Sequence, residues 1–190
     1  RRQRQMCIRD RNVITDYNAD VTTFWTVQQG AVLSIEIITA ERDTVSQGQG
    51  DILVTMVVSN QGEATADIVS VGLQFNSGDS DTDYTVVTMQ EAEVIYGGTS
   101  ETYIFSIEVS STAGLGVVSI EGSINGTDVN SGYIITDYTS EETDSWIVQR
   151  PAVLSIEIIT AERDIVSRGQ GDILVTMVVS NQGEATADIV

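Results

Sequence analysis

The sequence predicts an all-β protein made of tandem antiparallel β-sandwich units, and three observations lead to this expectation. Apolar residues alternate with polar ones over several runs, which is the pattern of strands that have one buried face and one wet face. Clusters of Gly, Asn and Ser separate these runs, as turns between strands require. A long stretch of the chain also occurs twice, at a spacing that suits one independently folding domain.

The first run illustrates the alternation. Leu33, Ile35 and Ile37 alternate with Ser34 and Glu36, so the three apolar side chains are expected to face a core. Val, Ile and Thr dominate this run and the later ones, and these residues suit a pleated surface. In chain order we expect strands at residues 32–39, 51–59, 66–75, 84–89, 101–109, 116–124 and 143–149, with a short piece near 93–96.

Turn residues mark the ends of these strands. In chain order they are Gln47-Gly48-Gln49-Gly50, Asn60-Gln61-Gly62, Asn76-Ser77-Gly78, Gly97-Gly98 and Asn125-Gly126. Seven or eight short strands in about 120 residues predict a sandwich of immunoglobulin type. No Cys pair can cross the sheets, so the core must rest on packing alone, and Trp146 in the last strand is expected to cap it.

A near-identical repeat predicts the domain organisation. Residues 31–69 and 152–190 agree at 37 of 39 positions and lie 121 residues apart. The same offset pairs Trp25 with Trp146, so the period extends toward the N-terminus. We therefore expect the C-terminal tail of a preceding unit at 12–30, a complete sandwich domain at 31–150, and the truncated N-terminal part of the next unit at 151–190.

The first eleven residues differ from the rest of the chain. Residues 1–11 hold five of the nine Arg and the only Cys, without helical periodicity or the apolar core of a signal peptide. The hexapeptide Met6–Arg11 resembles a translated sequencing-adapter end. A natural basic tail is the alternative. We interpret residues 1–11 as a non-native segment and leave them out of the fold prediction.

The composition excludes several classes of function. The chain has a net charge of −19, no His, one Cys and one Pro, and all nine basic residues are Arg. Without His there is no Ser-His-Asp triad and no imidazole metal site, and without Lys there is no Schiff base. Such an acidic chain is repelled by nucleic acid and by anionic membrane surfaces, and no run of 18 apolar residues could span a membrane. We therefore expect no enzyme, no nucleic-acid partner and no membrane insertion in this segment.

The acidic residues form two clusters. Asp79, Asp81 and Asp83 alternate on an expected loop, where their carboxylates can converge on Ca²⁺, although the EF-hand pattern is not matched. A solvated acidic hairpin loop is the alternative, and both interpretations stay open. The second cluster has irregular spacing and is expected to be a solvated part of the long loop before the last strand; its members are Asp137, Glu141, Glu142 and Asp144.

Val45–Gln49 leads into the expected strand Ile52–Val58 and then into Ser59–Ala64, where the chain has a V-x-N-x-G pattern. Gly97–Ser100, the aromatic strand around Phe105 and the later Gly114–Gly116 form a second pattern. Both patterns resemble those of the CARDB family, the cell-adhesion-related domains of bacterial surface proteins. The resemblance covers about 90 residues, and residues 126–145 depart from it. It implies an extracellular or cell-surface, array-forming sandwich, and it carries over no catalytic residue.

Two functions remain. The first is a non-catalytic structural or adhesive repeat of a secreted or cell-surface bacterial protein, which acts as a spacer or stalk and has neighbouring repeats as its partners. The alternative is an accessory module of a larger extracellular enzyme that binds a surface glycan or a protein. An exposed row of aromatic residues would favour the alternative, and the candidates for it are Tyr84, Tyr96, Tyr133 and Tyr138.

Overall fold

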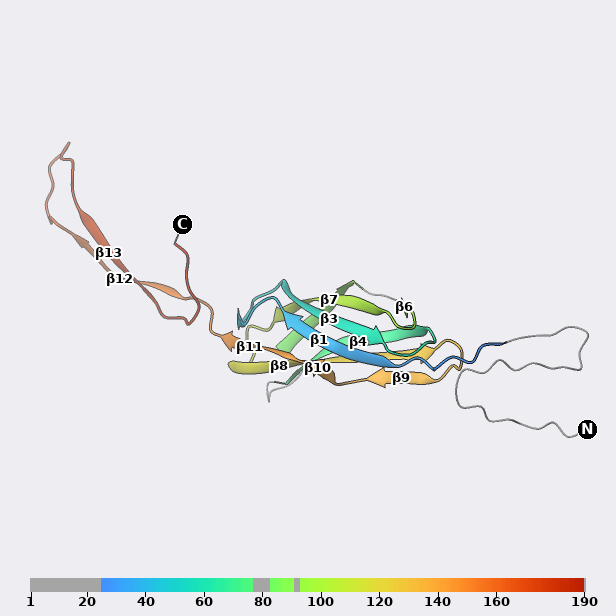
Figure 1. The fold of residues 1–190 in the computed structure, drawn as a ribbon. Helices are drawn as coiled ribbons and strands as arrows, with labels where there is room; N and C mark the ends of the chain where they lie inside the picture. The colour runs from blue at the N-terminus through green and yellow to red at the C-terminus, as the bar shows by residue number, and fades with distance from the viewer. Residues whose placement is uncertain (1–24, 77–82, 91–92, 190) are drawn as a thin grey trace, which may run out of the picture.

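The computed structural model describes residues 25–76, 83–90 and 93–189, and Figure 1 shows them as a β-sandwich followed by a separate hairpin. Within this part of the chain the first sheet has five strands in the order β10-β1-β3-β7-β5. Its strands are β10 (Ser140–Glu142), β1 (Leu33–Ala40), β3 (Ile52–Asn60), β7 (Ser100–Val109) and β5 (Tyr84–Gln90).

The second sheet has six strands in the described residues, in the order β2-β11-β8-β4-β6 with β9 also paired to β8. Its strands are β2 (Thr44–Ser46), β11 (Asp144–Gln149), β8 (Gly116–Asp128), β4 (Ala66–Asn76), β6 (Val94–Ile95) and β9 (Ile134–Asp137). The hairpin beyond the sandwich consists of β12 (Leu154–Ala161) and β13 (Val175–Asn181). No helix in the described residues is long and apolar enough to cross a membrane.

The prediction of an all-β sandwich is confirmed, but the sheets are mixed and not wholly antiparallel. β10 pairs with β1 in parallel, and β2 pairs with β11 in parallel. Both β2 and β10 are three-residue strands on segments that cross from one sheet to the other. After crossing between the sheets, β10 runs in the same direction as the edge strand β1, and β2 runs in the same direction as β11, so both pairings are parallel.

The core lies between the two sheets and is purely apolar at its centre. Ile35, Val54, Met56, Phe105 and Ile120 are fully buried there. At one side Trp146 is buried and its ring stacks on that of Phe75, with the ring centroids 5.4 Å apart. The expectation that the tryptophan of the last strand closes the core is confirmed.

The alternation in β1 is interrupted by a bulge. Glu36 has no partner in the ladder with β3, and the register shifts between Ile35 and Ile37. The extra residue turns Ile38 into the core, where it is 2% exposed, and leaves Ile37 only half-buried. The prediction that Ile37 faces the core was therefore wrong, because a bulge moves every later side chain to the other face.

Residues 126–145 are also more regular than the sequence suggested. β8 continues through Asn125-Gly126, so this pair is not a turn, and the short strands β9 and β10 form within what was expected to be a long loop. Gly126 is needed for a different reason: a Cβ at this position would lie 2.6 Å from the carbonyl oxygen of Asp67. Gly126 pairs with Ile68, at the point where β4 itself has a register shift, and the two backbones approach closely there.

The bulge gives a testable prediction about stability. We expect Ile38→Ala to lower the free energy of unfolding by about 2–4 kcal/mol, because it leaves a cavity in the core. Ile37→Ala removes the same atoms from a half-buried site and should cost less, about 1 kcal/mol. Urea unfolding of the two variants measures the difference. An equal loss for both, or a larger one for Ile37→Ala, would contradict the placement of the bulge.

Candidate functional site

The segment that enters the sandwich is held by the loop that follows β3. This loop, Asn60–Ala64, and the two residues Gln29 and Gly30 form what we call the linker clamp. The backbone N–H of Gln29 donates to Oε2 of Glu63 at 3.1 Å. The carbonyl oxygen of Gln29 accepts from the backbone N–H groups of Glu63 at 3.1 Å and Ala64 at 3.0 Å. Both the backbone N–H and the carbonyl oxygen of Gln29 are thus hydrogen-bonded to the loop.

The shape of the loop is fixed by the buried side chain of Asn60. Its Oδ1 accepts from the backbone N–H groups of Val32 and Gly62, each at 3.1 Å. Its Nδ2 donates to the carbonyl oxygens of Ala64 at 2.8 Å and Ile95 at 3.1 Å. A side-chain amide has two donors and one acceptor oxygen with two lone pairs, so its hydrogen-bonding capacity is fully used.

Gly62 lets the linker approach the loop closely. A Cβ at this position would lie 2.0 Å from the carbonyl oxygen of Gly30 and 2.8 Å from Cα of Ala31. These neighbours are backbone atoms and cannot move aside as a flexible side chain could. Any side chain at position 62 would therefore push the linker out of the clamp.

A second anchor acts on the next residue of the chain. The carboxylate of Asp128, at the end of β8, accepts from the backbone N–H of Ala31 at 2.6 Å, from Asn130 at 2.9 Å and from Ser131 at 2.7 Å. These bonds, that of Ala31 first, lower the pKa of Asp128 below its ordinary value, against the opposing effect of burial. The entering strand is thus tied to both sheets, because Asn60 belongs to the first and Asp128 to the second.

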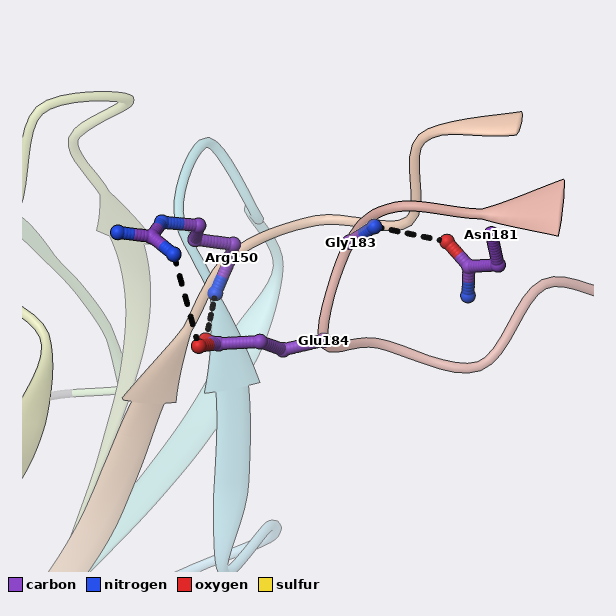
Figure 2. Close-up of polar contacts among 4 residues, drawn as sticks. All are labelled: Arg150, Asn181, Gly183 and Glu184. Carbon is purple, nitrogen blue, oxygen red and sulfur yellow. Dashed lines mark hydrogen bonds and ion pairs between the residues drawn. The ribbon is translucent and has the colours of Figure 1, made fainter. Parts of the chain in front are cut away.

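The same arrangement occurs again after the sandwich, where Arg150 takes the place of Gln29 (Figure 2). The backbone N–H of Arg150 donates to Oε2 of Glu184 at 2.8 Å, and its carbonyl oxygen accepts from Ala185 at 3.1 Å. Oδ1 of Asn181 accepts from Val153 at 3.1 Å and Gly183 at 3.0 Å. The ladder of β12 with β13 has the register of β1 with β3, including the shift at the bulge.

The clamp recognises the backbone of the linker and not its side chains. We call the connection at Gln29 the first joint and the connection at Arg150 the second joint. The central bonds of both joints are made by the main chain of these residues, so different side chains are tolerated at this position. Arg150 adds an ion pair, with Nη1 3.9 Å from Oε1 of Glu184, but both side chains are largely exposed. An exposed ion pair of this kind contributes little to stability.

The second joint contains no free length of chain. Gln149 is the last residue of β11 and pairs with Ser46 of β2, and its carbonyl oxygen accepts from Gln47 at 3.0 Å. The next residue, Arg150, is already bound to the loop of the following hairpin. Since one residue belongs to the sandwich and its neighbour to the clamp, no unbound residue separates the sandwich from the hairpin that follows.

The structure describes only one of the three predicted calcium ligands, Asp83. Asp79 and Asp81 lie outside the described residues, so the structure does not test their part in a site. The carboxylate of Asp83 accepts from the backbone N–H of Gly114 at 3.3 Å. The described residues contain no group of three or more Asp, Glu, His or Cys that could hold a metal ion. The calcium site therefore stays a prediction.

The second acidic cluster is not simply a solvated loop. Oδ2 of Asp137 accepts from the backbone N–H of Ile35 at 2.8 Å, and Oδ2 of Asp144 accepts from that of Ala40 at 2.7 Å. The two aspartates flank the short strand β10 and bind two amides of β1, the strand with which β10 pairs. The expectation was wrong for these two residues, whereas Glu141 and Glu142 are exposed as expected.

The four candidate tyrosines do not form one surface row. Tyr84 is 7% exposed and its ring stacks on Phe75 at a centroid distance of 4.4 Å, so its place among the surface candidates was wrong. Tyr96, Tyr133 and Tyr138 are exposed. However, Tyr133 and Tyr138 lie at opposite ends of β9, and Tyr96 follows β6. This separation does not favour a flat aromatic platform for a glycan.

The second anchor, at Asp128, predicts a specific dependence of stability on pH. The pKa of Asp128 is lowered in the folded state from an ordinary value of 3.8. Its contribution to stability is therefore fully present above the unfolded pKa and is lost as the pH falls through the folded pKa, because the unfolded state binds the proton more readily. We expect Asp128→Asn to lower the urea midpoint at neutral pH, and the gap to the parent chain to narrow in acid.

A matched control separates this effect from general loss of charge. Asp67→Asn removes an exposed carboxylate from the same sandwich and should change the midpoint little at either pH. Unfolding curves of the three chains at neutral pH and in acid give the comparison. A gap for Asp128→Asn that stays constant across this range would contradict the role of its charge.

Comparisons with known proteins give only distant similarities. No protein-family model matches the sequence, and no curated protein matches it. Among solved structures, the chain is similar to a FixG-related protein from Vibrio parahaemolyticus, with 13% identity, a TM-score of 0.39, and coverage of 63% of this chain and 96% of the other. It is also similar to the major pilin subunit BcpA of Bacillus cereus, with 8% identity, a TM-score of 0.35, and coverage of 93% and 64%.

Proposed function

We propose that the chain is part of a non-catalytic spacer, a structural or adhesive repeat of a secreted or cell-surface bacterial protein. The observation that carries this proposal is the recurrence of the linker clamp. The main chain of Gln29 before the sandwich, and that of Arg150 121 residues further on, each donates to a glutamate carboxylate and accepts from an alanine N–H. A joint without slack at every unit is what a stalk needs in order to hold its tip at a constant distance.

The proposed division into units follows from the same period. Residues 12–30 would be the tail of one unit, 31–150 a complete domain and 151–190 the start of the next. In β1, Leu33, Ile35 and Ile38 are 0–7% exposed, whereas their counterparts in β12 are 51–63% exposed, namely Leu154, Ile156 and Ile159. An apolar face of this kind supports the interpretation that the hairpin is part of a sandwich and corresponds to β1 and β3.

The resemblance to the CARDB family includes residues that also build the clamp. The matching residues Asn60 and Gly62 are those that shape the loop and admit the linker. A motif that builds a joint is expected in domains that occur in arrays. From the resemblance we also propose an extracellular or cell-surface location, with neighbouring repeats as partners and a surface glycan or protein as the ligand of the assembly.

The charge of the unit supports an extended arrangement. Residues 31–151 carry 19 acidic and two basic side chains. Units with this charge repel one another when they approach side by side. The clamp acts over one or two residues at the joint and holds the units end to end against this repulsion. Both features favour a rod over a collapsed cluster.

The clamp provides the test of the spacer proposal. We expect spin labels placed on the sandwich and on the β12–β13 hairpin of the 190-residue chain to give a narrow distance distribution. Glu184→Ala removes the acceptor of the Arg150 N–H and should broaden it. Glu162→Ala removes an exposed carboxylate from the same hairpin and should leave it unchanged. Equal widths in all three chains, or a broad distribution in the parent chain, would contradict the proposal.

A calcium ion bound by Asp79, Asp81 and Asp83 would reduce the self-repulsion of the unit, and we keep this site as a separate proposal. We expect the melting temperature to rise with added Ca²⁺ and to fall again with a chelator. Asp81→Asn should abolish the shift, because it removes the central carboxylate. Differential scanning calorimetry measures both effects. A melting temperature that does not respond to Ca²⁺ would end this proposal.

A further inference from the structure

A glutamine connects the linker to a second loop of the sandwich. Oε1 of Gln28 accepts from Nδ2 of Asn130 at 3.0 Å, and its Nε2 donates to the carbonyl oxygen of Glu63 at 3.5 Å. Asn130 lies in the turn between β8 and β9. The segment before the clamp therefore touches this turn as well as the loop after β3.

In the 121-residue period, Gln28 corresponds to Gln149. Gln149 is the last residue of β11 and belongs to the second sheet, where it pairs with Ser46. If the contact made by Gln28 recurs at the next joint, the side chain of Gln149 binds the β8–β9 turn of the following unit. One residue then belongs to the sheet of one unit and contacts the turn of the next, so the two sandwiches approach each other closely.

Each of the two surfaces that this glutamine brings together has exposed apolar side chains. At the end of the sandwich where the chain leaves, Leu115 precedes β8, and Val117 pairs with Ile147 on β11; all three are exposed, and we call them the exit surface. At the end where the chain enters, Val129 adjoins Asn130, and Tyr133 and Ile134 begin β9; these three, also exposed, form the receiving surface.

We propose that the exit surface of one unit packs against the receiving surface of the next copy of the same repeat. This inference rests on the proposed spacer function. The contact between the two surfaces would stiffen the spacer. The clamp provides continuity, since Gln149 and Arg150 adjoin each other at the joint. The linker also holds the next copy at a high effective concentration. A free copy is not tethered in this way, and its negative charge repels it from the sandwich.

The test uses an extended chain in which residues 70–150 follow Val190, so that the hairpin is completed to a second unit. Cys7 is replaced by Ser, and Leu115→Cys in the first unit is combined with Cys at the position matching Val129 in the second. A short bismaleimide crosslinker should join this pair. The control pair combines Leu115→Cys with Cys at the position matching Val87, which is exposed on β5 far from the turn, and should not be joined.

The outcomes separate this inference from the spacer proposal. Crosslinking of the Val129 pair alone supports the interface. Crosslinking of both pairs or of neither overturns it. The spacer proposal is tested separately, by the spin-label distances in the parent and Glu184→Ala chains.

A second variant keeps the inference falsifiable if the cysteine chains fold poorly. Leu115→Ser should leave the melting temperature of the 190-residue chain nearly unchanged, because Leu115 is exposed there, and should lower that of the extended chain. Equal effects in the two chains would overturn the interface.

Discussion

The hydrogen bonds of the Asn60 side chain are the interaction on which the joint depends. Burying an amide is costly unless its polar atoms are paired, and here four bonds offset that cost. They bind the start of β1 through Val32, the loop before β4 through Ala64 and the second sheet through Ile95. Because one side chain fixes these three segments at once, the loop is preorganised to bind the linker.

The acidic residues of the sandwich do more than provide charge. Asp137 and Asp144 complete the hydrogen bonding of β1, which is otherwise paired on that side only by the three residues of β10. Glu36, at the bulge, accepts a hydrogen bond from the hydroxyl of Ser59, and this bond is the main cause that lowers its pKa. Side-chain acceptors on exposed strands occupy amides that could otherwise pair with another chain.

The sequence predicted the long strands well because a period of two persists over seven or more residues. It did not predict β2, β9 or β10, which are too short to show a period. The bulge at Glu36 was hidden because Ile37 and Ile38 are both apolar, so either could face the core. The acceptors Asp137 and Asp144 depend on contacts about 100 residues away in the chain, and no local pattern records these. The motif around Asn60 was visible in the sequence, but its role required the geometry.

The backbone recognition in the clamp has a consequence for how such a protein changes over time. In the proposed spacer, each unit contains both halves of a joint, namely the strand end that enters the joint and the loop that binds it. Insertion or deletion of one whole repeat in the gene therefore leaves every remaining joint intact, whatever side chain stands at the linker position. The length of the proposed spacer can then change in steps of one domain through recombination between near-identical repeats, with no compensating mutation.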